Sequence, residues 1–122
     1  IIKGYTTDGK TIKNQKKDIY AEVMSKETSV YLRNLMKDVV YKNDETKAKP
    51  FYTSAGVKTS TAQTGKFNLN GKELNNAWLT GFFPANNPEY AVTVLVEDAE
   101  SGNKDAAPLF RKIADRIYKL KG

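Results

Sequence analysis

"NAWLTGFFPANNPEYAVTVLVE" (residues 76–97) decides the fold, because two strand-like runs flank a short polar turn in it. The first run, Asn76–Phe83, ends at Pro84. The second run, Tyr90–Glu97, would be largely apolar on both faces of a strand, a pattern typical of a strand with two buried faces. We therefore expect two antiparallel strands, with the second at the centre of a sheet.

A further strand is predicted just upstream, in "AGVKTSTAQTGKF", Ala55–Phe67. Valine and threonine favour extended backbone, so we expect this strand to run from about Val57 to Gln63. The Asn70-Gly71 pair that follows suits a tight turn, whose central residues need positive φ. Short links between three successive strands predict an antiparallel meander.

Two helices are expected to pack on this sheet. The first, Ser25–Lys42, begins with a serine that can cap it, and its apolar residues recur at three-four spacing. The second, Pro108–Leu120, has a proline where the first turn tolerates one. Both apolar stripes predict core packing. They consist of Leu32, Leu35, Met36, Val39 and Val40 in the first helix, and of Leu109, Phe110, Ile113, Ile117 and Tyr118 in the second.

The order of elements predicts an α+β architecture in a single domain, residues 1–122. Near the N-terminus, Asp8-Gly9 is a hairpin turn signal, so a short hairpin is expected before a polar stretch, Gln15–Asp18. The expected fold is an antiparallel sheet, built from the three-strand meander plus this N-terminal hairpin, and packed by helices.

Composition excludes several kinds of chemistry. The 122 residues include no cysteine and no histidine, which excludes disulfides, thiol nucleophiles and histidine-based triads and leaves no typical zinc site. The net charge of +6 suits nucleic acid, an anionic wall polymer or an anionic membrane surface, or simply a solvated lysine-rich face. No apolar run is long enough to span a membrane. Because the chain begins at Ile1, we expect it to be a piece of a longer protein.

The hydroxyl-rich run around Lys58 has three interpretations. A phosphate-binding loop needs G-x-x-x-x-G-K-[ST], and here Val57 precedes the lysine, so this interpretation is rejected. A polar strand facing water is the simplest alternative. The third is that Lys58-Thr59-Ser60 stands for the Lys-Thr/Ser-Gly motif of penicillin-recognising serine enzymes.

Longer stretches support the third interpretation. "AGVKTSTAQ" resembles the substrate-binding strand of high-molecular-weight penicillin-binding proteins, and residues 76–98 resemble their next two strands. "MSKETSVYLRNLMKDVV" and "AAPLFRKIADRIY" resemble segments that flank these strands in the family. The order and spacing fit across nearly the whole chain. The chain therefore resembles the C-terminal part of a penicillin-binding protein transpeptidase domain, a partial β-lactamase/transpeptidase-like domain.

The resemblance implies a role for each motif residue. Lys58 would be catalytic and substrate-binding, since its charge would attract the carboxylate of the acyl donor or of a β-lactam. Thr59 would bind that carboxylate, and the backbone N–H of Thr61 would form half of an oxyanion hole. The strand edge from Ser60 to Gln63 would pair with substrate backbone. The implied reaction is acyl transfer through a serine ester, which cross-links peptidoglycan peptides and needs neither metal nor cofactor.

Two departures from the family pattern stand out. Ser60 replaces the usual glycine, and its side chain could point away from a ligand or narrow the site. The nucleophile of the family, a Ser-x-x-Lys at a helix start, is missing upstream of Lys58. Ser101 and Lys104 have that spacing but lie after the motif in a predicted turn without a helix start. Tyr41–Asn43 resembles a second family motif, yet it is expected only to end a helix.

The isolated chain is therefore expected to carry the substrate strand of a peptidoglycan D,D-transpeptidase and to be inactive alone. A non-catalytic penicillin-binding-like module or a β-lactam sensor, binding wall peptide or a partner protein, is the alternative. The expected partners are peptidoglycan stem peptide and β-lactams, without nucleic acid. The resemblance implies an extracytoplasmic site, with the membrane reached only through an upstream anchor. Exposed sheet edges predict self-association of the isolated chain.

Overall fold

The computed structural model describes residues 4–5, 13–14, 21–43 and 45–121. At the N-terminus, strand β1 (Gly4–Tyr5) pairs antiparallel with β2 (Lys13–Asn14), which confirms the predicted hairpin. These two strands form a separate two-stranded sheet, so among the described residues the hairpin does not extend the three-strand meander as predicted. The predicted Asp8-Gly9 turn and the stretch Gln15–Asp18 lie outside the described residues. No helix in the described ranges is both long and apolar enough to cross a membrane.

Helix α1 (Lys26–Tyr41) begins where the sequence predicts. The Ser25 hydroxyl accepts a hydrogen bond from the Thr28 backbone N–H at 3.1 Å, which satisfies an otherwise free donor of the first turn. At the other end, the Lys42 backbone N–H donates to the Asp38 carbonyl. The predicted and observed bounds therefore differ by one residue at each end.

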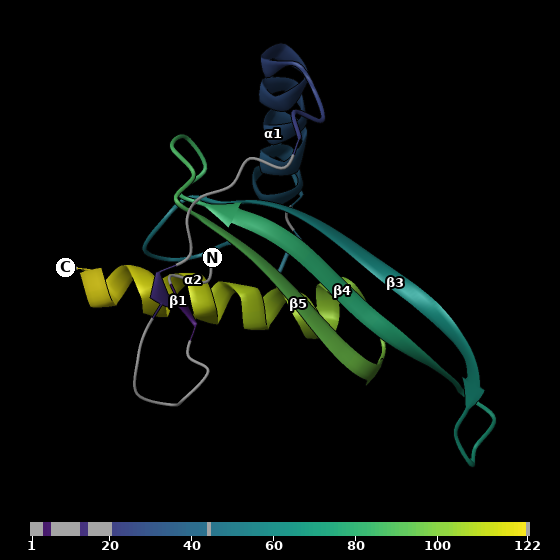
Figure 1. Cartoon of the computed structure of the whole chain (residues 1–122). Coiled ribbons are helices and arrows are strands. Elements are labelled where there is room, and N and C mark those ends of the chain that lie inside the picture. The colour runs from purple at the N-terminus through teal and green to yellow at the C-terminus, as the bar shows by residue number, and fades with distance from the viewer. Residues whose placement is uncertain (1–3, 6–12, 15–20, 44, 122) are drawn as a thin grey trace.

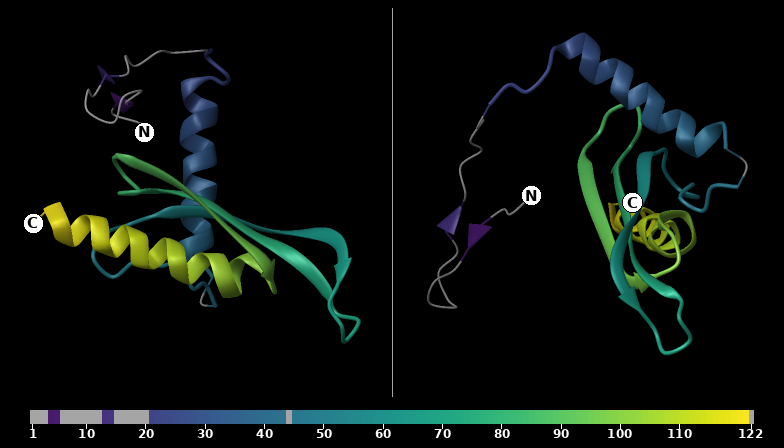
Figure 2. Two further views of the ribbon diagram at one scale, coloured as in Figure 1. Left: turned by 60° about the horizontal axis from the view of Figure 1, so that its bottom comes forward. Right: turned by 90° about the vertical axis from the view of Figure 1, so that its right-hand side faces the viewer.

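The apolar stripe of α1 is only partly buried, contrary to the predicted core packing. Val40 is buried and Val39 packs against the core, whereas Leu32 and Leu35 remain 44% and 45% exposed. Figure 2 shows the reason, since α1 meets the sheet only near one end of the helix. Within the described ranges, the N-terminal part of the helix has no sheet surface beneath it.

The three predicted strands form an antiparallel sheet in the order β3-β4-β5. Their bounds are β3 (Gly56–Phe67), β4 (Glu73–Phe83) and β5 (Tyr90–Ala99), so each is longer than predicted. Between β3 and β4, Gly71 has φ +74°, which confirms the predicted turn at that pair. The backbone N–H of Asn68 donates to the carbonyl of Lys72 across this turn.

The prediction that Tyr90–Glu97 is the central strand was wrong. The central strand is β4, and β5 lies at an edge of the described sheet. The apolar character of β5 does not reflect burial on both faces, because Val94 is buried while Leu95 is 43% exposed. Helix α2 covers only one face of this sheet (Figure 1), so a residue on the other face stays accessible whatever its polarity.

Helix α2 (Ala107–Lys121) lies along the covered face (Figures 1 and 2). It follows a π-helical turn, η1 (Gly102–Ala106), in a segment where the sequence predicted only a loop. Its Asp115 carboxylate accepts hydrogen bonds from the backbone N–H groups of Phe51 and Tyr52, at 2.8 and 3.1 Å. The helix therefore holds both the sheet and the segment that leads into β3.

The core lies between the sheet and α2. Alternate residues of β4 point into it, including the fully buried Leu79 and Phe83. Phe110 of α2 lies edge-on to Phe83, with ring centroids 6.0 Å apart and an interplanar angle of 76°. Gly81 makes room for it, because a Cβ at that position would stand 2.8 Å from the Phe110 ring. This packing fixes β4, and through β4 it fixes the motif strand β3.

Candidate active site

The five predicted site residues all lie on β3, an edge strand of the described sheet. Antiparallel pairing with β4 is regular through this part of the strand, with Lys58 opposite Thr80 and Ser60 opposite Trp78. Side chains alternate between the faces of a sheet, so the five do not point the same way. Thr59, Thr61 and Gln63 share the face of the buried Val57, and Lys58 and Ser60 occupy the opposite face.

The sheet face that carries Lys58 and Ser60 is exposed to solvent within the described part of the chain. Lys58 and Ser60 are exposed, and so is Thr80 of the neighbouring strand. Trp78, opposite Ser60, is 39% exposed. The Thr80 and Thr93 hydroxyls lie 3.0 Å apart on this face and extend its polar character to β5. The Ser60 side chain therefore stands on the sheet face beside an indole ring and does not project from the strand edge.

Backbone directions on β3 follow from the close approach of Gly102. A Cβ on Gly102 would stand 2.6 Å from the Trp78 carbonyl oxygen, 2.7 Å from the Ser60 oxygen and 3.0 Å from the Ser60 nitrogen. In an antiparallel pair, the two carbonyl oxygens can both lie this close to one point only when the two residues hydrogen bond to each other. The backbone groups of Ser60 thus point toward β4. Since direction alternates along a strand, those of Thr59 and Thr61 point to the open edge.

The Lys58 ammonium group lies at this open edge. It donates a hydrogen bond to the carbonyl oxygen of Thr59, the residue that follows it. Because that carbonyl points away from β4, the lysine side chain curls from the outer face toward the edge. A positive charge and the outward N–H of Thr61 are therefore on the same side of the strand, where both could meet an anionic or carbonyl-bearing ligand.

Gln63 differs from the other predicted site residues. Its side-chain amide donates to a Glu73 carboxylate oxygen at 2.9 Å, which holds it against β4. The register shifts immediately beyond it, between Gln63 and Lys66, and Gly65 has φ +69°. An irregularity of this kind bends a strand and ends its regular edge. The edge with regular geometry therefore runs from Gly56 to Gln63.

Ser101 and Lys104 do not form a nucleophile and base. Ser101 caps the start of η1, which corrects the prediction that no helix begins there, and its hydroxyl accepts a hydrogen bond from the Lys104 backbone N–H at 3.2 Å. A hydrogen bond to the Glu100 carboxylate raises the pKa of the Lys104 ammonium. A lysine that serves as a general base needs a lowered pKa. Tyr41 ends α1 as predicted, and its hydroxyl accepts a hydrogen bond from the Ala55 N–H.

The η1 turn supplies contacts that the sequence did not predict. Gly102 is buried against β3 and β4, and Asn103 contacts the segment before β3. The signal that could have found them is weak, since "SGNK" looks like any polar turn. Only the packing shows that its glycine is required for contact and not for turn geometry.

Acid is expected to loosen this turn. The Asp105 carboxylate accepts hydrogen bonds from the backbone N–H groups of Ser101 and Glu100, which lower the pKa of Asp105 below its ordinary value of 3.8. The stabilisation is present above the ordinary pKa and is lost as pH falls through the lower, folded-state pKa. Urea unfolding of the chain between about pH 5 and pH 2 should therefore show a steeper loss of stability than in Asp105→Asn. Parallel curves for the two proteins would contradict this expectation.

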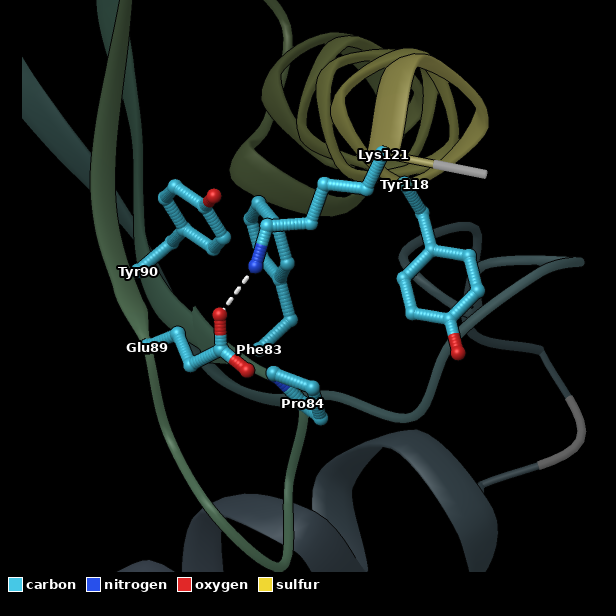
Figure 3. A pocket seen from close by; sticks show the side chains of 6 residues that line it. All are labelled: Phe83, Pro84, Glu89, Tyr90, Tyr118 and Lys121. Atoms are coloured by element: carbon cyan, nitrogen blue, oxygen red, sulfur yellow. Dashed lines mark hydrogen bonds and ion pairs between the residues drawn. The ribbon is translucent and has the colours of Figure 1, made fainter.

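A separate pocket of about 310 Å³ lies between the β4–β5 turn and the end of α2, and its lining side chains are drawn in Figure 3. Half of its lining residues are aromatic, namely Phe83, Tyr90 and Tyr118. The Lys121 ammonium, 4.9 Å from the centre of the Tyr90 ring, hydrogen bonds to the Glu89 carboxylate. That hydrogen bond raises the pKa of Lys121. Both charged groups of the pocket are therefore engaged with each other. Across the described ranges, no cluster of acidic residues could hold a metal ion.

The fold and the open edge define a class of protein, an α+β domain in which the edge strand β3 carries a lysine at its open edge. The sequence profile of the penicillin binding protein transpeptidase domain matches residues 1–115. The match covers most of the chain, so the chain belongs to this family, as the motifs predicted.

Individual relatives agree with the family assignment. Peptidoglycan D,D-transpeptidase MrdA of Haemophilus influenzae is 44% identical over 73 residues, which are 52% of this chain and 11% of that protein. Peptidoglycan D,D-transpeptidase FtsI of Buchnera aphidicola is 31% identical over 116 residues, 88% of this chain and 20% of that one. The chain thus spans a fifth or less of the length of these relatives.

A solved structure of a peptidoglycan synthetase from Bifidobacterium adolescentis has the same fold in this region. The superposition has a TM-score of 0.76 and 19% sequence identity, and it covers 98% of this chain and 22% of the other. Identity at this level indicates the fold alone. The predicted partial α+β domain is therefore confirmed at the level of architecture.

Proposed function

We propose that the chain is the C-terminal part of a peptidoglycan D,D-transpeptidase domain and that residues 58–63 form its substrate-binding strand. The observation that carries this proposal is the open edge of β3, where the Lys58 ammonium and the outward Thr61 N–H lie on one side. Family membership supports the reaction class, and the edge geometry supports the assignment of this strand.

The reaction is acyl transfer from a peptide that ends in a carboxylate. A serine hydroxyl from another part of the domain attacks the carbonyl carbon of the last peptide bond, and its oxygen replaces the nitrogen of the terminal D-Ala, which leaves as an amine. The resulting ester is then opened by the amine of a second peptide, which forms the cross-link. Lys58 binds the carboxylate electrostatically, and Thr59 contributes a hydroxyl to it. The Thr61 N–H stabilises the negative charge that develops on the carbonyl oxygen.

The edge strand explains how a peptide substrate is aligned. An extended peptide that adds to a sheet edge forms main-chain hydrogen bonds with the outward backbone groups. On β3 these are the groups of Thr59 and Thr61, because Ser60 faces β4. A β-lactam, which also carries a carboxylate beside an acyl group, meets the same charge and the same N–H.

Fluorescent penicillin tests this proposal directly. We expect the full-length gene product to retain the label on a denaturing gel, because an acyl-serine ester survives unfolding, and the 122-residue chain to retain none. The reason is that Ser101 and Lys104 are engaged in the η1 turn and form no activated pair. A stable adduct on the short chain would contradict the assignment of the nucleophile to another part of the domain.

A Ser60→Gly variant of the full-length protein serves as the matched control. If neither natural form is labelled but the glycine variant is, the Ser60 side chain hinders the ligand and the strand assignment holds. If the variant also fails, the non-catalytic alternative is favoured, in which the module binds wall peptide or a partner without acyl transfer. In either case we place the working site on the extracytoplasmic side of the membrane, with any anchor outside this chain.

A further inference from the structure

The η1 turn contacts strand β3 at Ser60 and Thr61, next to the N–H that is proposed to stabilise the oxyanion. Gly102 is fully packed against the backbone of Ser60 and Trp78, at distances of 2.6 to 3.0 Å from the position that a Cβ would occupy. Real Cβ atoms do not approach backbone atoms so closely, so any other residue would push the strand or the turn away. The glycine is needed for this close approach, because its φ is not in the left-handed region.

A hydrogen bond joins the same glycine to the next residue of the strand. The Gly102 backbone N–H donates to the Thr61 hydroxyl oxygen at 3.3 Å. The Thr61 side chain points toward η1, while its own N–H points to the open edge. Fixing the side chain on one face therefore fixes the direction of the N–H at the edge.

The turn that carries Gly102 is itself held at several points. The Asn103 side chain accepts a hydrogen bond from the Lys47 N–H at 3.1 Å and donates one to the Glu45 carbonyl at 3.2 Å. The Asp105 carboxylate accepts two backbone N–H groups where the turn begins. Because these contacts are to backbone groups, they resist displacement of the η1 turn. The turn therefore holds β3 in a fixed position.

From these contacts we propose that Gly102 is a positioning residue for acyl transfer. It fixes the position of the Ser60–Thr61 backbone, and so directs the Thr61 N–H toward the oxyanion that develops in the reaction. This inference rests on the function proposed above. A donor to a developing oxyanion works only at close to the correct distance, and an error of about 1 Å can lower a rate about 100-fold. The Gly102 contact acts on the transition state more than on initial binding, since the carboxylate contact of Lys58 does not depend on it.

The test uses the full-length gene product and acylation by a fluorescent penicillin under single-turnover conditions. Gly102→Ala should lower the acylation rate constant by about 10- to 100-fold, while the dissociation constant of the initial complex changes less than about threefold. Thr61→Val, which removes the acceptor of the Gly102 N–H, should lower the same rate constant, and Thr61→Ser should restore it. A purely structural role would not separate the rate constant from the dissociation constant.

Lys104→Ala is the matched control, because Lys104 lies in the same turn and its exposed ammonium group hydrogen bonds to the exposed Glu100 carboxylate. It should behave as the natural protein. Melting temperatures of all variants show which of them remain folded, and Thr61→Val keeps the test open if Gly102→Ala does not fold. Unchanged acylation in both Gly102→Ala and Thr61→Val would overturn the proposal.

A second measurement separates this proposal from the proposed function. Hydrogen exchange of the amides in residues 57–63 should quicken about tenfold in Gly102→Ala relative to Lys104→Ala. If neither the natural protein nor its Ser60→Gly variant is labelled by penicillin, the transpeptidase function fails, yet exchange still reports whether Gly102 holds the strand. Equal exchange in the two variants would overturn the positioning role whatever the activity.

Discussion

Replacing Lys58 with alanine in the full-length gene product will lower the second-order rate constant of penicillin acylation by about 100-fold or more. The ammonium group lies at the open edge of β3, where it can meet the ligand carboxylate and the developing charge of the reaction. Removal of one group that stabilises such charge typically lowers a rate by about 10²- to 10³-fold. The rate is measured from the time course of labelling at several penicillin concentrations.

Two further variants define what the lysine contributes. Lys66→Ala removes the same charge from the same strand, beyond the register shift. It should change acylation less than about threefold, because an exposed charge so far along the strand from Lys58 is screened by solvent. Lys58→Arg keeps the charge but replaces a compact ammonium group with a planar fork, so an intermediate rate is expected. Equal losses in Lys58→Ala and Lys66→Ala would reduce the role of Lys58 to general electrostatic attraction.

Most of the fold could be predicted because its signals are local. The cap at Ser25 and the turn at Gly71 each depend on residues within one turn of chain, and the structure has both where expected. Which strand is central could not be predicted in this way. That property depends on pairing partners, and the apolar residues of β5 read as buried on two faces although helix α2 covers only one.

The residue types of the candidate site could be predicted from the sequence. The backbone directions and the packing contacts that position these residues could not. The motif placed Lys58 and Thr61 on one strand, but the direction of each backbone group depends on the register with β4. The contact of Gly102 with Ser60 joins residues more than 40 positions apart in the sequence, and no local pattern signals it. The exposed part of α1 was misjudged for a similar reason, since an apolar stripe shows that a helix can pack and not that a surface is present to receive it.

Replacing Phe110 with alanine will strongly lower the stability of the chain. The ring is fully buried between α2 and the sheet, edge-on to Phe83 and against the bare backbone of Gly81. Truncation of a buried phenylalanine typically destabilises a protein by about 3–5 kcal/mol, because the lost burial is joined by an unfilled cavity. Here β4 is held by strands on both sides and cannot collapse into the space. The free energy of unfolding is measured by urea denaturation of the 122-residue chain.

The neighbouring residue provides the control for this prediction. Leu109 is 41% exposed on the same turn of α2, so Leu109→Ala should lower the free energy of unfolding by about 1 kcal/mol or less. Domains of this size are stable by only about 5–15 kcal/mol, so Phe110→Ala should leave a substantial unfolded fraction at moderate temperature. Because α2 supports β4, and β4 positions β3, the full-length Phe110→Ala protein should also lose penicillin labelling in parallel with its folded fraction. Similar losses of stability in the two variants would mean that α2 does not pack through Phe110, and the support inferred for the motif strand would then have to come from η1 alone.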